Sequence, residues 1–194
     1  MTVSQPARLP RGDCFFGLHF DLHPQKHDTV LGADTTEENV AKLLDRVRPD
    51  FVQYDCKGHP GYTGYPTKVG WASPGIVKDA LAIWRTVTAA RGVGLFVHYS
   101  GVIDQVAIEQ HPEWAAVDAE GKRADRATST FGPYVDELLI PQLREAATAY
   151  DLDGVWADGE CWGAVLDWSE VALVAWREAS RLTFRPRPTG FPEL

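Results

Sequence analysis

Hydrophobic residues along this chain follow two alternating periodicities. Short stretches in which apolar and polar residues alternate predict β-strands at 15–23, 51–59, 93–101 and 153–160. Apolar residues that recur every three or four positions predict helices over about 37–47, 75–91, 135–149 and 169–182, with a short helical stretch at 109–117. Strands separated by helices form right-handed β/α units around a parallel sheet. The pattern therefore predicts an α/β protein with about four β/α units.

The predicted strands all end in polar, titratable residues, which favours a ligand site at their carboxyl ends. No dinucleotide glycine fingerprint follows the first strand, and the chain has no phosphate-binding loop of the G-x-x-x-x-G-K-[ST] type. A (β/α) TIM-barrel type is therefore favoured over a dinucleotide-binding fold, and no cofactor is expected.

The length changes this picture, because a complete barrel uses about 250 residues and the chain has 194. We expect a half or incomplete barrel over residues 15–183, preceded by an N-terminal extension over 1–14 and followed by a Pro-rich tail over 184–194. Half a barrel leaves strand edges and an apolar face open. The expected partner is either a second copy of the chain or a missing C-terminal half.

Composition excludes several classes of protein. The formal net charge of −8 and the scattered basic residues disfavour binding to nucleic acid or to an anionic membrane. The chain contains neither an apolar run long enough to cross a bilayer nor an N-terminal signal peptide, so a cytoplasmic location is predicted. Cys14, Cys56 and Cys161 have no C-x-x-C spacing, which argues against a disulfide framework or a structural zinc site.

Asp158 is the sharpest catalytic candidate. It ends the fourth strand and shares a strand face with Trp156 and Glu160. Paired carboxylates at strand ends are what glycoside hydrolysis requires, although a spacing of two residues along one strand does not by itself make a catalytic pair. The alternative is that Asp158 only caps the loop after the strand.

The first strand carries His19, Asp21 and His23 on one face, and His98 ends the third strand. These side chains suit hydrogen bonds to substrate hydroxyls. The same residue types also hold divalent metals in barrel mouths, so a metal-dependent hydrolase that uses these four residues remains a rival prediction. Structural histidines are the third possibility.

The second strand places Asp55, Lys57 and His59 on one face by the period-two rule. We interpret them as polar groups that line a cleft, with an Asp55–Lys57 ion pair as the alternative. The long Gly-, Pro- and Tyr-rich segment 58–75 that follows is typical of a functional loop, and its aromatic residues would either stack on a sugar or anchor the loop.

Two segments resemble glycoside hydrolases of the alpha-L-fucosidase family, family 29. The stretch Gln142-Leu143-Arg144-Glu145, then Tyr150 and Asp153-Gly154-Val155-Trp156-Ala157-Asp158-Gly159, is similar to the segment that leads to that family's nucleophile. Lys57-Gly58-His59-Pro60-Gly61-Tyr62 resembles its K-H-H-D-G-F sugar-binding motif, with Gly58 and Pro60 departing from it. The longer phrase FVQYDCKGHPGYTGYPTKVG is closer to the related group called hypothetical glycosyl hydrolase 6.

The resemblance implies retaining hydrolysis of a glycosidic bond by the N-terminal part of a catalytic TIM barrel, with Asp158 as nucleophile. It also implies a carbohydrate substrate bound by His19, Asp21, Asp55, Lys57, His59, His98, Trp156 and Glu160. The family's general acid/base lies beyond the matched region, so no residue of this chain is assigned to that role. A non-catalytic carbohydrate-binding remnant is therefore an alternative to the glycoside hydrolase.

Overall fold

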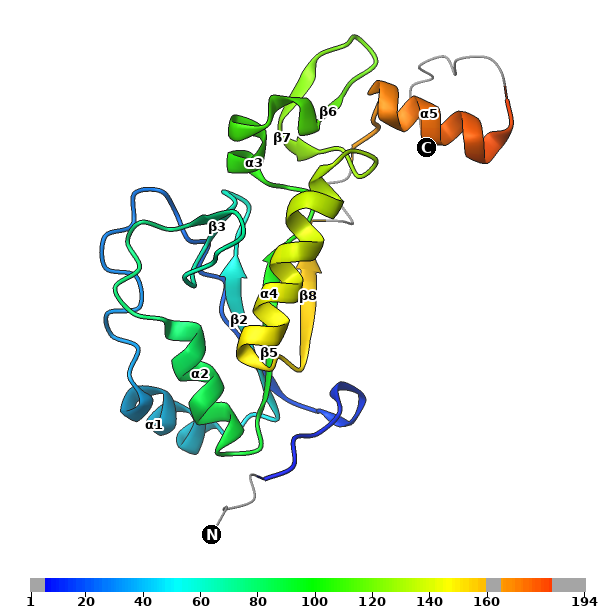
Figure 1. Cartoon of the computed structure of the whole chain (residues 1–194). Coiled ribbons are helices and arrows are strands. Elements are labelled where there is room, and N and C mark those ends of the chain that lie inside the picture. Colours follow the sequence, from blue (N-terminus) through cyan, green and yellow to red (C-terminus); the bar gives the residue numbers. More distant parts are fainter. Residues whose placement is uncertain (1–5, 160–164, 183–194) are drawn as a thin grey trace, which may run out of the picture.

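The computed structural model describes residues 6–159 and 165–182 and shows a mixed α/β fold around one main sheet (Figure 1). The four main strands of this sheet are β1 (Gly17–His19), β2 (Phe51–Lys57), β5 (Gly94–Ser100) and β8 (Gly154–Asp158). They pair in parallel in the order β1-β2-β5-β8. The predicted α/β class with a parallel sheet is therefore confirmed.

Three helices supply the core on one face of this sheet. They are α1 (Glu37–Val47), α2 (Ala80–Ala89) and α4 (Ile140–Tyr150), and Figure 1 shows α2 and α4 lying over the strands. Their apolar faces pack on alternate residues of the two central strands, which are Val52, Tyr54 and Cys56 of β2 and Leu95, Val97 and Tyr99 of β5. The other residues of these strands therefore face away from the helices.

The first strand is shorter than the predicted 15–23. It follows a short 3-10 helix, η1 (Arg11–Asp13), and ends at His19. Beyond it the chain turns, because the backbone N–H groups of Leu22 and His23 both donate to Asp55 Oδ2 and His23 has a positive φ of 46°. A side-chain acceptor thus replaces the sheet partner that a longer strand would need.

One predicted helix starts later than expected, and another differs in the type of its first turn. The helix expected from residue 75 begins at Ala80, where Asp79 accepts a hydrogen bond from the N–H of Ala82 and so caps it. The helix expected at 135–149 is π-helical over η3 (Val135–Leu139) before α4 begins. Pro141 explains this change, because it has no N–H to donate to the carbonyl four residues earlier.

The region 103–134 differs most from its prediction. The expected helical stretch at 109–117 is wrong: α3 (Gln105–Gln110) ends before Pro112 and is followed by the 3-10 turn η2 (Pro112–Trp114). Strands β6 (Ala115–Val117) and β7 (Arg123–Thr128) then form an antiparallel hairpin. Figure 1 shows this hairpin and α5 (Glu170–Ser180) beyond the carboxyl ends of the parallel strands.

The long segment 58–75 contains two short strands. β3 (Tyr62–Thr63) pairs antiparallel with the end of β2, and β4 (Trp71–Ala72) pairs in parallel with β3. Tyr65, in the loop between them, is 1% exposed and donates to Glu145 Oε2 of α4. This aromatic residue therefore anchors the segment to the helix layer.

The parallel sheet does not close into a barrel within residues 6–159 and 165–182. There, β1 pairs only with β2 and β8 only with β5, which leaves an open edge on each outer strand. On β8, Val155 and Trp156 are 39% and 45% exposed. No helix in these ranges is both long and apolar enough to cross a bilayer. Cys14 and Cys56 are free thiols, and Cys161 lies outside the described residues.

Candidate active site

The register between neighbouring strands brings polar residues of three strands together at the carboxyl ends of the strands. Asp55 of β2 lies beside His98 of β5, which in turn lies beside Trp156 of β8. Two residues further along β5 and β8, Ser100 lies beside Asp158. Paired residues of parallel strands project from the same face, so these side chains share the face that points away from the helices.

His98 connects two carboxylates in this group. Its side chain is 1% exposed, and its Nε2 lies 3.1 Å from Asp158 Oδ2 while its Nδ1 lies 3.2 Å from Asp55 Oδ1. Burial alone would lower the pKa of His98, but the interactions with Asp55 and then Asp158 outweigh it and raise the pKa above its ordinary value. The imidazole of His98 therefore lies between two carboxylates, one at each ring nitrogen.

Asp158 is ionised and accessible. Burial tends to raise its pKa, but the hydrogen bond from His98 and the N–H of Gly159, 2.8 Å from Oδ1, together lower the pKa below its ordinary value. Its side chain is 17% exposed. Asp55, in contrast, is fully enclosed and also accepts two backbone N–H groups, so only Asp158 of the two meets solvent.

His59 approaches Asp158 from the end of β2. Ser100 donates its hydroxyl hydrogen to the carbonyl of Ile103 at 2.6 Å, so the 2.7 Å contact between Ser100 Oγ and His59 Nδ1 requires the imidazole to be the donor. His59 Nε2 then faces Asp158 Oδ2 at 3.6 Å. Burial lowers the pKa of His59, with Asp158 opposing the shift. The neutral form of His59 therefore carries its proton on Nδ1.

Aromatic rings border this group on the open side of β8. The His19 ring lies edge-on to Trp156 at 5.3 Å and to His98 at 5.8 Å, and Gln53 Nε2 lies 3.1 Å from His19 Nδ1. Trp156 also lies 5.1 Å from the His98 ring. Because it is 45% exposed, Trp156 presents an apolar ring surface beside Asp158.

Asp21 and His23 lie on the segment that turns away after β1. Asp21 Oδ1 is 2.6 Å from His23 Nε2 and 3.9 Å from His98 Nδ1. The His23 ring stacks on the His98 ring at 5.6 Å. The turn imposed by Asp55 therefore returns both residues to the strand ends, although they are outside the strand itself.

Lys57 lies apart from the imidazoles. The pairing of β2 with β5 shifts register between Asp55 and Lys57, and this irregularity breaks the alternation on which the shared face was predicted. Lys57 is fully buried, with its Nζ against Asp104 Oδ2 and 3.1 Å from the Tyr134 hydroxyl. Burial tends to lower its pKa, but Asp104 and Tyr134 raise it. Its ion-pair partner is Asp104, not Asp55.

Comparisons with known proteins agree on one group of enzymes. No protein-family model matches the chain. An alpha-L-fucosidase from Dictyostelium discoideum is 24% identical over 146 residues, which make up 70% of this chain and 28% of that protein. Alpha-L-fucosidase isoenzyme 2 from Paenibacillus thiaminolyticus superposes with a TM-score of 0.73 at 20% identity, over 88% of this chain and 26% of that one. The chain resembles alpha-L-fucosidases.

The alpha-L-fucosidase from Vibrio sp. strain EJY3 also has this fold, with a TM-score of 0.54 at 19% identity over 75% of this chain and 24% of that chain. The resemblance predicted from sequence motifs is thus confirmed. The fucosidase-like chain spans 28% of the length of the curated relative.

The fucosidase-like fold brings together six of the residues that the sequence pointed to. They are His19, Asp21, Asp55, His59, His98 and Trp156, and they form one connected group with Asp158, which contacts His59 and His98 directly. Glu160 lies outside the described residues. Sequence reasoning did not identify Ser100 as the group that orients His59, or Asp104 as the partner of Lys57, because both relations join separate segments of the chain.

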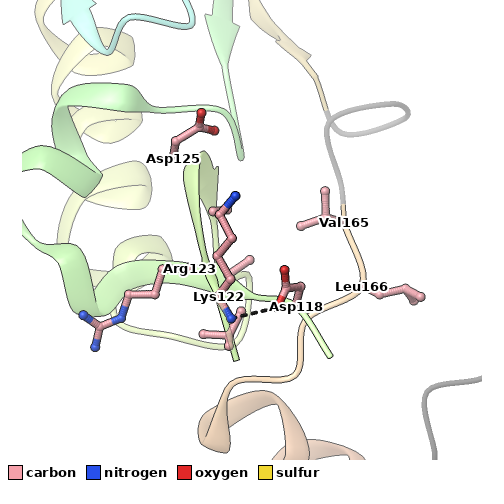
Figure 2. Close-up of a pocket in the computed structure, with 9 residues that line it drawn as sticks. Asp118, Lys122, Arg123, Asp125, Val165 and Leu166 are labelled. Atoms are coloured by element: carbon pink, nitrogen blue, oxygen red, sulfur yellow. Dashed lines mark hydrogen bonds between the residues drawn. The ribbon is translucent and has the colours of Figure 1, made fainter. Parts of the chain in front are cut away.

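A separate pocket lies at the β6–β7 hairpin. Figure 2 shows it between Asp118, Lys122 and Arg123 on one side and Val165 and Leu166 on the other. Its volume is about 250 Å³. None of the residues grouped with Asp158 lines it. We therefore place the candidate active site at the strand ends and not in this pocket.

Proposed function

We propose that this chain is part of a retaining glycoside hydrolase of the alpha-L-fucosidase type, belongs to a (β/α) barrel and has Asp158 as its nucleophile. The observation that carries the proposal is the state of Asp158: a carboxylate with a lowered pKa, held by His98 at a strand end and still reached by solvent. The similarity to fucosidases supplies the substrate class.

The proposed reaction proceeds in two displacements. Asp158 attacks the anomeric carbon, the glycosidic C–O bond breaks, and the leaving oxygen takes a proton from a general acid. Water then attacks the same carbon, releases Asp158 and loses a proton to that group, now a base. Asp55 is unsuited to the acid role, because it is enclosed and its Oδ2 is occupied by backbone N–H groups.

The surrounding side chains would bind the sugar. His59 Nε2, 3.6 Å from Asp158 Oδ2, and the exposed Asp21, 3.9 Å from His98 Nδ1, would hydrogen-bond sugar hydroxyls, and Trp156 would supply a ring for the apolar face of the sugar. His19 supports Trp156, and His98 with Asp55 fixes the nucleophile. Glu160 would join them from its position after β8. Lys57 would act only through the fold.

The open edges of β1 and β8 are where further strands would complete the barrel. Either a second copy or a C-terminal half is expected to pair there, because unpaired strand edges with exposed Val155 and Trp156 favour association. Light scattering of the purified chain will show whether it self-associates.

The proposal is tested by hydrolysis of a 4-nitrophenyl α-L-fucoside, whose good leaving group reduces the need for a general acid. We expect slow turnover by the native chain and a loss of at least about a thousandfold in Asp158→Asn. Asp136→Asn, a change to an exposed carboxylate on η3, is the matched control and should retain activity. Equal activity in Asp158→Asn and the control would refute the proposal. Fucose binding without turnover would instead indicate a carbohydrate-binding protein.

A further inference from the structure

Four side chains near the proposed nucleophile form a compact group of potential metal ligands. Asp21, His23, Asp55 and His98 each offer one ligand atom, and these atoms all lie within 4.8 Å of one another. Three of the closest approaches are 2.6 Å between Asp21 Oδ1 and His23 Nε2, 3.2 Å between Asp55 Oδ1 and His98 Nδ1, and 3.9 Å between Asp21 Oδ1 and His98 Nδ1. Ligand atoms of a tetrahedral zinc ion are about 3.3 Å apart, given bonds of about 2.0 Å.

Three of these atoms are buried without a hydrogen-bond partner. They are His23 Nε2, Asp55 Oδ1 and His98 Nδ1, which approach other polar atoms but are not aligned with them for hydrogen bonds. Asp55 and His98 are each 1% exposed, so water does not satisfy them from outside. Leaving buried polar atoms unpaired is costly, and a cation that accepts a lone pair from each would remove that cost.

The groups behind the ligands are arranged as in known metal sites. His98 Nε2 contacts Asp158 Oδ2 at 3.1 Å, which fits an imidazole that donates its outer N–H to a carboxylate while its other nitrogen binds the metal. Asp55 Oδ2 accepts the N–H of Leu22 at 2.8 Å, so Asp55 Oδ1 remains for the ion. Both buried ligands are therefore already oriented.

We propose that Asp21, His23, Asp55 and His98 bind one divalent transition-metal ion, Zn²⁺ above all. Two imidazoles favour zinc over magnesium or calcium, and two carboxylates balance its charge. His19 is not a ligand, because its Nδ1 contacts Gln53 and its ring packs on Trp156. The ion lies behind His98 as seen from Asp158, so it positions the proposed nucleophile and does not replace it. The proposal does not depend on fucosidase activity.

The test is metal binding by the untagged, full chain after treatment with a chelator. Titration calorimetry with Zn²⁺ should give one equivalent, and Co²⁺ should give the intense visible absorption of a tetrahedral site. Asp21→Asn and His23→Ala change partly exposed ligands, which favours folding of the variants, and each should weaken Zn²⁺ binding by at least about tenfold. His111→Ala, at an exposed histidine outside the cluster, should bind as the native chain does.

Two results would overturn the proposal. One is a native chain that binds no stoichiometric Zn²⁺. The other is Zn²⁺ affinity that is unchanged in both ligand variants, or that falls equally in His111→Ala, since binding would then lie elsewhere on the surface. Circular dichroism of each variant verifies that a loss of binding does not come from unfolding.

Discussion

Strand β2 supplies two charged groups, two positions apart, to clusters of opposite character. Lys57 enters a closed cluster in which Asp104, Tyr99 and Tyr134 complete its contacts, and Asp104 is as deeply buried as the lysine. Asp55 enters an open cluster with buried atoms that lack hydrogen bonds. A fully satisfied polar network serves the fold, whereas an incompletely satisfied one beside solvent is where a ligand is expected to bind.

The largest expected effect of breaking the closed cluster is on stability. Lys57→Met leaves Asp104 buried without a counter-charge and should lower the free energy of unfolding by about 3–5 kcal/mol. Lys42→Met, which removes an exposed pair with Glu38, should change it by less than about 1 kcal/mol. Urea unfolding of both variants makes the comparison.

A second variant identifies the cause of that loss. Lys57→Met combined with Asp104→Asn removes both charges and keeps an acceptor for the N–H of Ala107 at the start of α3. Part of the lost stability should return. A double variant no more stable than Lys57→Met would show that the lysine acts through packing and not through its charge.

The next effect concerns the open cluster. Ser100→Ala removes the acceptor for His59 Nδ1 and the donor to the Ile103 carbonyl, so we expect a loss of about 1–3 kcal/mol in the free energy of unfolding. Released from this contact, His59 should turn, and KM for the aryl fucoside should rise. Exposed Thr130→Ala serves as the control. A loss of stability with unchanged KM would mean that His59 does not bind substrate.

The smallest effect is expected at the opposite, amino-terminal end of the strands. Asp50 accepts the N–H groups of Phe15 and Phe16, and these hydrogen bonds lower its pKa. A lowered folded-state pKa contributes stability above the ordinary aspartate pKa and loses it as pH falls through the folded value. The native chain should therefore exceed Asp50→Asn in unfolding free energy at pH 7, and the difference should shrink below about pH 4. A difference that grows on acidification would contradict this assignment.

Sequence patterns predicted the layers of the molecule well. Alternation and helical spacing depend on nearby residues, so the four parallel strands and the helix Glu37–Val47 lie where they were predicted, although β1 covers only Gly17–His19 of the predicted 15–23. The predicted helices differ from the structure, in boundary or in type of turn, where one residue overrode the periodicity. Pro141 changes a helical turn and Pro112 separates a short helix from a hairpin, and both effects come from a missing N–H.

The candidate site was less predictable, because it depends on long-range relations. The register shift in β2 redirects Lys57, and no local pattern in the sequence indicates such a shift. The bridge that His98 makes between Asp55 and Asp158 joins three strands. Which imidazoles meet a carboxylate is decided by strand register, and register is fixed only when the sheet assembles.

The most direct measurement of the central claim is covalent labelling of the nucleophile by 2-deoxy-2-fluoro-α-L-fucosyl fluoride. Fluoride leaves without protonation, so the reaction needs no general acid and tests Asp158 alone. We predict one added fluorofucosyl group, located by peptide mass spectrometry on Asp158 and absent from Asp158→Asn. An intact native chain that remains unlabelled, or a label on any other residue, would contradict the assignment of Asp158 as the nucleophile.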